Sequence, residues 1–413
     1  MWTLSTEYQK ALGRKIAFHR KRRGLSQKEF AGLLDRSEAW VSQVERGVRR
    51  IDRMTVLEKV AEVLDVPVAE LAAEAPIVAS VAEGEPVGAS RLRLVLSAAH
   101  SLKAILGRQE GATPDVPVLR AEVDRAWSLT HQGNYADLAE LLEGLVPRLE
   151  SAARSVPEAD RVELFRLLAV MYHTCSGALA NMGEPEAAWI AVDRAVVAAE
   201  RADDPLLMAA GEFRLAIVFL GARHFEQAAQ ASGSAADALR PLAESGQAEA
   251  VALRGALTLQ RAVAAARLNQ ADDAYGYLRD AREMANQVGD GRNDYNTEFG
   301  PTNVGLHEVA VAVDLGDAGV ALRAALTIDP SRLSAERQTR FQIDLARAYA
   351  QRRQVADSLS ALLTARGLSP EMVRALPMVK QLVADLLTMS QPPSEELRAL
   401  AAELGVHEVR TGT

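Results

Sequence analysis

Six short polar turns recur along residues 117–413, and their periodicity limits the fold of this chain more than any other feature. The turns read GNYADL, GEPEAA, RHFEQA, NQADDA, GDAGVA and RQVADS, and they begin at residues 133, 183, 223, 269, 316 and 353. Their spacings are 50, 40, 46, 47 and 37 residues. Ala and Leu, which favour helices, dominate the stretches between them. The pattern predicts stacked pairs of long helices, each pair packing mainly on its neighbours.

The clearest of these repeats is AWSLTHQGNYADLAELL at residues 126–142, with Trp127, Gly133 and Tyr135 at typical positions of a known motif. It resembles a tetratricopeptide (TPR-like) helical repeat, with helices longer than the 34-residue standard. The resemblance implies an α-solenoid whose concave inner face binds peptides, small molecules or proteins. We expect Trp127 and Trp189 to pack in the core.

Residues 1–73 have a different pattern, which predicts five short helices. The apolar spacing places them at about 5–23, 27–34, 38–46 and 53–64, with a final turn at PVAELAA, 67–73. Ser26 and Glu29 form a capping-box pattern, Ser37 is the N-cap expected for the third helix, and Gly47 follows that helix. The expected fold is all-α, a five-helix N-terminal domain followed by an α-solenoid.

Charge is distributed unevenly between these parts. Residues 1–53 contain 13 Lys and Arg against 6 Asp and Glu, a net +7, whereas the other 360 residues carry −15. A basic end on an acidic body is typical of a small nucleic-acid-binding module. Charge alone is equally compatible with a solvated basic face that has no partner.

The N-terminal residues resemble a known family more specifically. GLSQKEFA, SEAWVSQVERG and TVLEKVAEVLDV, within residues 10–72, are similar to the lambda-repressor/Cro-like (XRE) helix-turn-helix domain. Asp35 stands where that family usually has Gly, but Asp tolerates a left-handed backbone better than most residues. The resemblance implies operator DNA binding by the 38–46 helix, and an internal salt bridge between Arg20 and Glu45.

The helix at 38–46 is the predicted recognition helix, since one helix fits a major groove about 12 Å wide. Val41 and Val44 give it an apolar stripe, which leaves four residues facing outward to read bases: Glu38, Ala39, Ser42 and Gln43. Gln can read adenine, Glu can accept from cytosine, and Ala can contact the thymine methyl group. The candidates for phosphate contacts are Gln27, Lys28, Arg36, Trp40, Arg46, Arg49 and Arg50.

The domain boundaries follow from composition. We predict the DNA-binding domain at 1–73, a Pro-, Gly- and Glu-containing linker at 74–90, a connecting helix and loop at 91–116, and the repeat domain at 117–413.

One segment of the repeat domain departs from the Ala- and Leu-rich pattern. Residues 286–313 concentrate Asn, Asp and other polar side chains, which can bind an extended peptide backbone or a polar metabolite. Asn303 and His307 share a helix face if a helix starts near Thr302. The candidate effector-binding residues are Asn293, Tyr295, Asn296, Glu298, Asn303, His307, Tyr172 and Arg214. An inter-helix loop with capping residues remains the alternative, and a satisfied core histidine is the expected state of His173.

Patterns of enzymes and membrane proteins are missing from the sequence. It has no Walker A loop and no GxGxxG, HEVAV lacks the second His of a zinc-protease helix, and Cys175 stands alone. We therefore predict no enzymatic activity, no cofactor and no metal site. A single Cys and no run of about 18 apolar residues predict a cytoplasmic protein without membrane association.

The combined pattern predicts a sequence-specific transcription regulator that binds double-stranded operator DNA. Proteins of the family that the chain resembles bind DNA as two-fold symmetric dimers, which implies a homodimer. The TPR-like domain is expected to sense a peptide or small-molecule effector. XRE domains joined to TPR-like bodies resemble pheromone receptors of Gram-positive bacteria and regulators of actinobacteria, and the Ala- and Arg-rich composition favours the latter. The alternative is a DNA-tethered scaffold whose concave face binds a partner protein.

Overall fold

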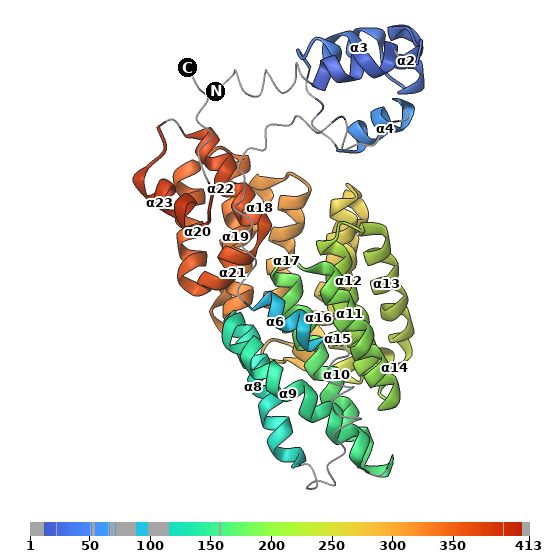
Figure 1. Cartoon of the computed structure of the whole chain (residues 1–413), viewed down its shortest axis with the longest axis vertical. Coiled ribbons are helices and arrows are strands. Elements are labelled where there is room, and N and C mark those ends of the chain that lie inside the picture. Colours follow the sequence, from blue (N-terminus) through green and yellow to red (C-terminus); the bar gives the residue numbers. More distant parts are fainter. Residues whose placement is uncertain are drawn as a thin grey trace. The chain divides into compact units, whose positions relative to one another are not determined.

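Helices account for all regular secondary structure in the described part of this computed structural model (Figure 1). The structure describes residues 12–21, 23–49, 51, 54–64, 66, 71, 88–97, 115–156, 158–390 and 392–406. Contacts divide the chain into one unit of residues 1–82 and 405–413 and a second unit of residues 83–404. No helix among the described residues is long and apolar enough to cross a bilayer.

The first unit is a small helical bundle, as the apolar spacing predicts. Residues 12–21 are helical, followed by α2 (Gln27–Leu33), α3 (Glu38–Glu45) and α4 (Met54–Leu64). Its core contains Leu12, Ile16, Phe30, Ala31, Leu34, Val41, Val44, Leu57, Val60, Ala61, Leu64 and Leu71. The predicted turn at 67–73 lies outside the described residues apart from Leu71, which is helical.

Local hydrogen bonds set the ends of α2 and α3. The hydroxyl of Ser26 accepts from the Glu29 amide at 3.1 Å, and the Glu29 carboxylate accepts from the Ser26 amide at 2.8 Å, so the predicted capping box is confirmed. Ser37 caps α3 by accepting from the Trp40 amide. Asp35 between the two helices has φ 55°, the left-handed conformation expected at this turn.

The second unit begins with α6 (Ala89–Val95) and continues as a series of antiparallel helices. Its first half contains α8 (Val116–Gln132), α9 (Tyr135–Ser155), α10 (Glu158–Asn181), α11 (Pro185–Arg201), α12 (Pro205–Gly221), α13 (Phe225–Ala238), α14 (Arg240–Glu244), α15 (Ala248–Arg267) and α16 (Ala271–Val288). Its second half contains η1 (Asp294–Asn296), α17 (Pro301–Asp314), α18 (Ala318–Ala325), η2 (Pro330–Arg332), α19 (Ala335–Gln351), α20 (Val355–Leu368), α21 (Pro370–Ala375), α22 (Pro377–Met389) and α23 (Glu395–Glu403).

All six predicted turns connect the two helices of a hairpin. The first residue of each turn has a positive φ, between 60° and 85°: Gly133, Gly183, Arg223, Asn269, Gly316 and Arg353. A left-handed residue after a helix ends that helix and reverses the chain. The six hairpins are α8–α9, α10–α11, α12–α13, α15–α16, α17–α18 and α19–α20, so the predicted array of helix pairs is confirmed.

Helices near the end of the array contact helices near its start, because α19 and α21 pack against α8, α9 and α10. The Glu371 carboxylate on α21 accepts from the amides of Tyr135 and Ala136 at 2.7 and 3.1 Å, at the positive N-terminus of α9. Asn181 at the end of α10 donates to Glu336 on α19 at 3.1 Å. Helix α19 also packs directly on α8.

Candidate nucleic-acid interface and internal pocket

The four predicted base-reading residues lie on α3, away from its buried stripe. Val41 and Val44 are 1% and 3% exposed and pack in the core of the first unit. Glu38 and Ala39 are exposed, whereas Ser42 and Gln43 are partly buried. The side chains of Glu38, Ser42 and Gln43 make no hydrogen bond to another described residue, so their polar groups are available to a partner.

A buried ion pair holds α3 against the first helix. Arg20 Nε and Nη2 donate to the two carboxylate oxygens of Glu45 at 2.5 and 3.0 Å, and the side chains of Arg20 and Glu45 are 8% and 6% exposed. Arg20 Nη1 also donates to the Leu25 carbonyl at 2.6 Å. Because the pair is bidentate and shielded from water, it fixes the position of α3 relative to the bundle.

The predicted phosphate-contact residues differ in their surroundings. Gln27 Nε2 donates to Glu45 at 2.7 Å, so the buried pair orients this side chain. The Arg36 guanidinium lies 5.9 Å from the centre of the Trp40 ring, and Arg46 Nε donates to the Ser42 carbonyl. The described basic candidates are all exposed, namely Lys28, Arg36, Arg46 and Arg49, while Gln27 and Trp40 are partly buried and Arg50 lies outside the described residues.

In the second unit, a strap, here residues 289–300, connects α16 to α17. Tyr295, Asn296 and Glu298 have φ values of 51°, 57° and 50°. Left-handed backbone costs a non-glycine residue about 1–2 kcal/mol, so the surrounding structure must hold the strap in this conformation.

Side chains of three helices supply that support through four consecutive carbonyls. Arg214 on α12 donates to the carbonyls of Tyr295 and Asn296 at 3.2 and 2.8 Å. Asn303 on α17 donates to those of Thr297 and Glu298 at 3.1 and 3.0 Å, and Arg337 on α19 also donates to Thr297. These bonds satisfy carbonyls that have no helical partner, as buried backbone requires.

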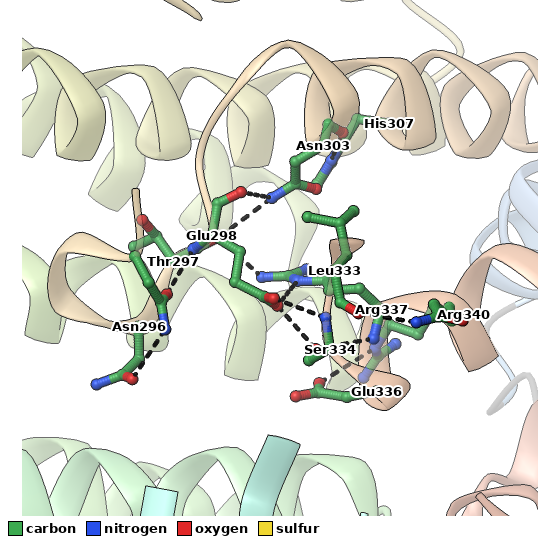
Figure 2. Close-up of polar contacts among 12 residues, drawn as sticks. Asn296, Thr297, Glu298, Asn303, His307, Leu333, Ser334, Glu336, Arg337 and Arg340 are labelled. Carbon is green, nitrogen blue, oxygen red and sulfur yellow. Dashed lines mark hydrogen bonds and ion pairs between the residues drawn. The ribbon is translucent and has the colours of Figure 1, made fainter. Parts of the chain in front are cut away.

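Glu298 ties the strap to the start of α19 (Figure 2). Its carboxylate accepts from the Ser334 amide and the Ser334 hydroxyl, both at 2.8 Å, and pairs with Arg337 at 3.5 Å. The N-terminus of α19 is thus occupied by a carboxylate of the chain itself. These contacts hold the strap and the N-terminus of α19 together.

Several predicted effector residues therefore have structural partners. Asn303 is 2% exposed, and the Nδ1 atom of His307 is bonded to the Asn303 carbonyl at 2.9 Å. The Tyr172 hydroxyl donates to Glu150 at 2.6 Å, and Tyr172 does not line the pocket described below. The start of α17 at Pro301 agrees with the helix expected near Thr302.

A pocket of about 420 Å³ lies beside the strap, within the volume range of small-molecule sites. Of the predicted residues, Asn293 and Asn296 line it. Its other lining residues are Asp124, Trp127, Ser128, His131 and Gln132 on α8, Val170 on α10, and Ser334 and Ala335 at the start of α19. Sequence reasoning missed most of them, because nothing local in α8 indicates that it faces α19.

A buried cation lies behind Trp127, one of the residues that line the pocket. The Arg214 guanidinium lies 4.8 Å from the ring centre of Trp127, and burial lowers the pKa of Arg214 to about 10, which still leaves it charged at neutral pH. Burial is also the main reason that the pKa of His131 is lowered, despite the nearby carboxylates of Glu298 and Glu336. His131 is therefore neutral at pH 7.

Two predictions about aromatic and histidine residues need correction. Trp127 is buried at 6% exposure, but Trp189 is 50% exposed and contacts Phe219 edge-on at 5.3 Å, because α11 turns this face outward. His173 is buried as expected, but its Nε2 atom has no hydrogen-bond partner among the described residues. The described residues contain no group of three or more His, Cys, Asp or Glu arranged to hold a metal ion.

Comparisons with known proteins support the first unit most directly. Residues 11–73 match the helix-turn-helix domain family. No curated protein sequence matches the chain. Among solved structures, the chain is similar to Bacillus thuringiensis PlcR in complex with the peptide PapR7 and DNA, at 14% identity and a TM-score of 0.26, over 67% of this chain and 96% of that chain. The first unit contains a helix-turn-helix DNA-binding domain.

Proposed function

We propose that this protein is an XRE-type transcription regulator, of the kind found in actinobacteria, that binds operator DNA as a homodimer and responds to an effector bound by its helical array. The DNA-binding part of the proposal rests on helix α3. Its outer face presents Glu38, Ala39, Ser42 and Gln43, while Arg20 and Glu45 hold it from behind. A rigid helix with unengaged polar side chains is what base reading requires.

The pocket beside the strap supports the sensing part of the proposal. It combines apolar surface with several hydrogen-bonding side chains, the usual composition of small-molecule sites. It also favours a sensor over the alternative of a DNA-tethered protein scaffold. We assign the protein no enzymatic activity and a cytoplasmic location, where it would reach DNA.

The proposed mechanism is a shift between conformations of the array. In a dimer, the two recognition helices must lie about 34–36 Å apart to reach successive major grooves. An effector that binds one conformation of the array more tightly changes the population with that spacing. The strap is the element suited to this response, because it contacts both the pocket and α19.

The DNA-binding part is tested with two variants of the full-length protein and a library of operator sequences. Gln43→Ala should weaken specific binding by about 1–3 kcal/mol and relax the preference at one base position. Lys28→Ala is the matched control. It should weaken binding equally for all sequences and reduce the slope of the logarithm of the binding constant against the logarithm of salt concentration by about one. Unchanged sequence selectivity in Gln43→Ala would contradict the placement of α3 as the recognition helix.

A further inference from the structure

The pocket wall contains hydrogen-bonding groups but almost no charge. Of its ten lining residues, Asp124 alone is an acid, and none is Lys or Arg. His131 is neutral at pH 7, since burial lowers its pKa. The remaining polar lining groups are the hydroxyls of two serines and the amides of Gln132, Asn293 and Asn296.

The arginines close to the pocket already have partners. Arg214 donates to two strap carbonyls, and Arg337 donates to a third and pairs with Glu298. Arg340 donates to Asn181 and pairs with Glu336 at 3.6 Å. Arg214 lies behind Trp127, and its buried Nε has no partner among the described residues. Because no Lys or Arg lines the pocket, a carboxylate or phosphate that entered it would lose its hydration beside Asp124 without direct contact to a cation, which is costly.

Several lining groups still have unused hydrogen-bonding capacity. Neither ring nitrogen of His131 and neither carboxylate oxygen of Asp124 is bonded to a described residue. Gln132 uses its amide nitrogen on Ser128 at 3.1 Å and leaves its oxygen unpaired within the described part. The unused acceptors are the Asp124 carboxylate, one ring nitrogen of His131 and the Gln132 oxygen, and they match a ligand that donates. The buried Nε1 of Trp127 is an unused donor.

Trp127, Val170 and Ala335 supply the apolar part of the wall, and Trp127 adds a flat aromatic group. An aromatic side chain packs well against another planar group. The pocket thus offers one flat apolar contact together with acceptors and neutral donors.

We propose that this pocket binds an uncharged small molecule that carries a flat ring and hydrogen-bond donors, such as a primary amide or hydroxyl groups, and that it discriminates against carboxylates and phosphates. The inference rests on the proposed effector-sensing function and names the ligand class of that site. Asp124, His131 and Gln132 are the side chains that accept hydrogen bonds from this ligand.

Acid–amide pairs of the same shape isolate the effect of ligand charge. The probes are indole-3-acetamide against indole-3-acetate and nicotinamide against nicotinate, titrated into the full-length protein by calorimetry at pH 7. At least one amide should bind about tenfold or more tightly than its acid. Asp124→Asn should reduce that ratio, because it removes the repulsion of an anion.

A second pair of variants locates the binding in the pocket. Ser128→Leu introduces bulk on the pocket side of α8 and should abolish amide binding. Ala121→Leu, an exposed residue of α8 outside the lining, should leave it unchanged. Amide binding that survives Ser128→Leu, or failure of both amides to bind, would overturn the inference.

Equal or tighter binding of the acids would also overturn it. If acid binding were then lost in Ser128→Leu, the effector pocket would stand and only the ligand class would be wrong. DNA selectivity of Gln43→Ala is a separate measurement, so failure of the ligand class and failure of the proposed DNA-binding function are distinguishable.

Discussion

Removing one partner of the buried Arg20–Glu45 pair should destabilise the first unit strongly. Arg20→Met keeps the length and apolar stem of the side chain but removes the bidentate contact to Glu45 and the bond to the Leu25 carbonyl. The Glu45 side chain is only 6% exposed, so its carboxylate would lose its charged partner in a site largely closed to water.

The magnitude follows from what remains around that carboxylate. Breaking a buried ion pair by deleting one partner typically costs about 3–5 kcal/mol. Gln27 Nε2 still donates to Glu45 at 2.7 Å and offsets part of the loss, because a hydrogen bond to a charged group stabilises it. We therefore expect a cost at the lower end, about 3 kcal/mol, or roughly 150-fold in an equilibrium constant.

Hydrogen exchange of the full-length protein measures this change separately for each unit. In Arg20→Met, protection of the amides in α2 and α3 should fall by about 150-fold, up to the limit set by the stability of the first unit. Amides of α10 and α15, in the second unit, provide an internal control and should keep their protection.

A double variant tests the electrostatic cause. Arg20→Met with Glu45→Gln leaves no charge in the site, and an uncharged replacement of a buried pair is often nearly neutral. The double variant should therefore be more protected than Arg20→Met alone. A loss below about tenfold in the single variant, or a double variant less protected than the single, would refute the view that this pair is shielded from water.

Two further predictions concern the second unit. Gly255→Ala on α15 would place a Cβ atom 2.0 Å from Phe299 Cζ in the strap, so it should lower the unfolding free energy by about 1–3 kcal/mol, measured by urea unfolding. Burial lowers the pKa of His173 to about 3, so below pH 6.5 the unfolded chain takes up a proton that the folded chain does not. His173 should therefore cost the fold about 2 kcal/mol between pH 7 and pH 5, and His173→Leu should remove that part of the pH dependence.

Each of these two predictions has a control. Gly221→Ala lies at the end of α12 with no atom within 4 Å of the added Cβ, so it should not destabilise the protein. An unchanged unfolding free energy in Gly255→Ala would contradict the close packing of the strap. For His173, equal pH slopes in the wild type and His173→Leu would contradict a neutral buried ring.

Local features of the chain were predictable from the sequence by itself. The capping box of Ser26 and Glu29, the inward stripe of Val41 and Val44, and the six hairpin turns depend on residues within a few positions of each other. Short-range hydrogen bonds and helical periodicity determine such features, so the helix-turn-helix domain and the repeated hairpins were both expected.

Tertiary structure alone decided which side chains line the pocket. Packing of α8 against the start of α19 brings residues about 200 positions apart together, and no local pattern encodes that pairing. Tertiary contacts likewise make Asn303 on α17 a support for the strap, and the orientation of α11 leaves Trp189 half exposed. A side chain's polarity is set by its sequence, but whether a backbone carbonyl, another side chain or a ligand satisfies it depends on which distant helices meet.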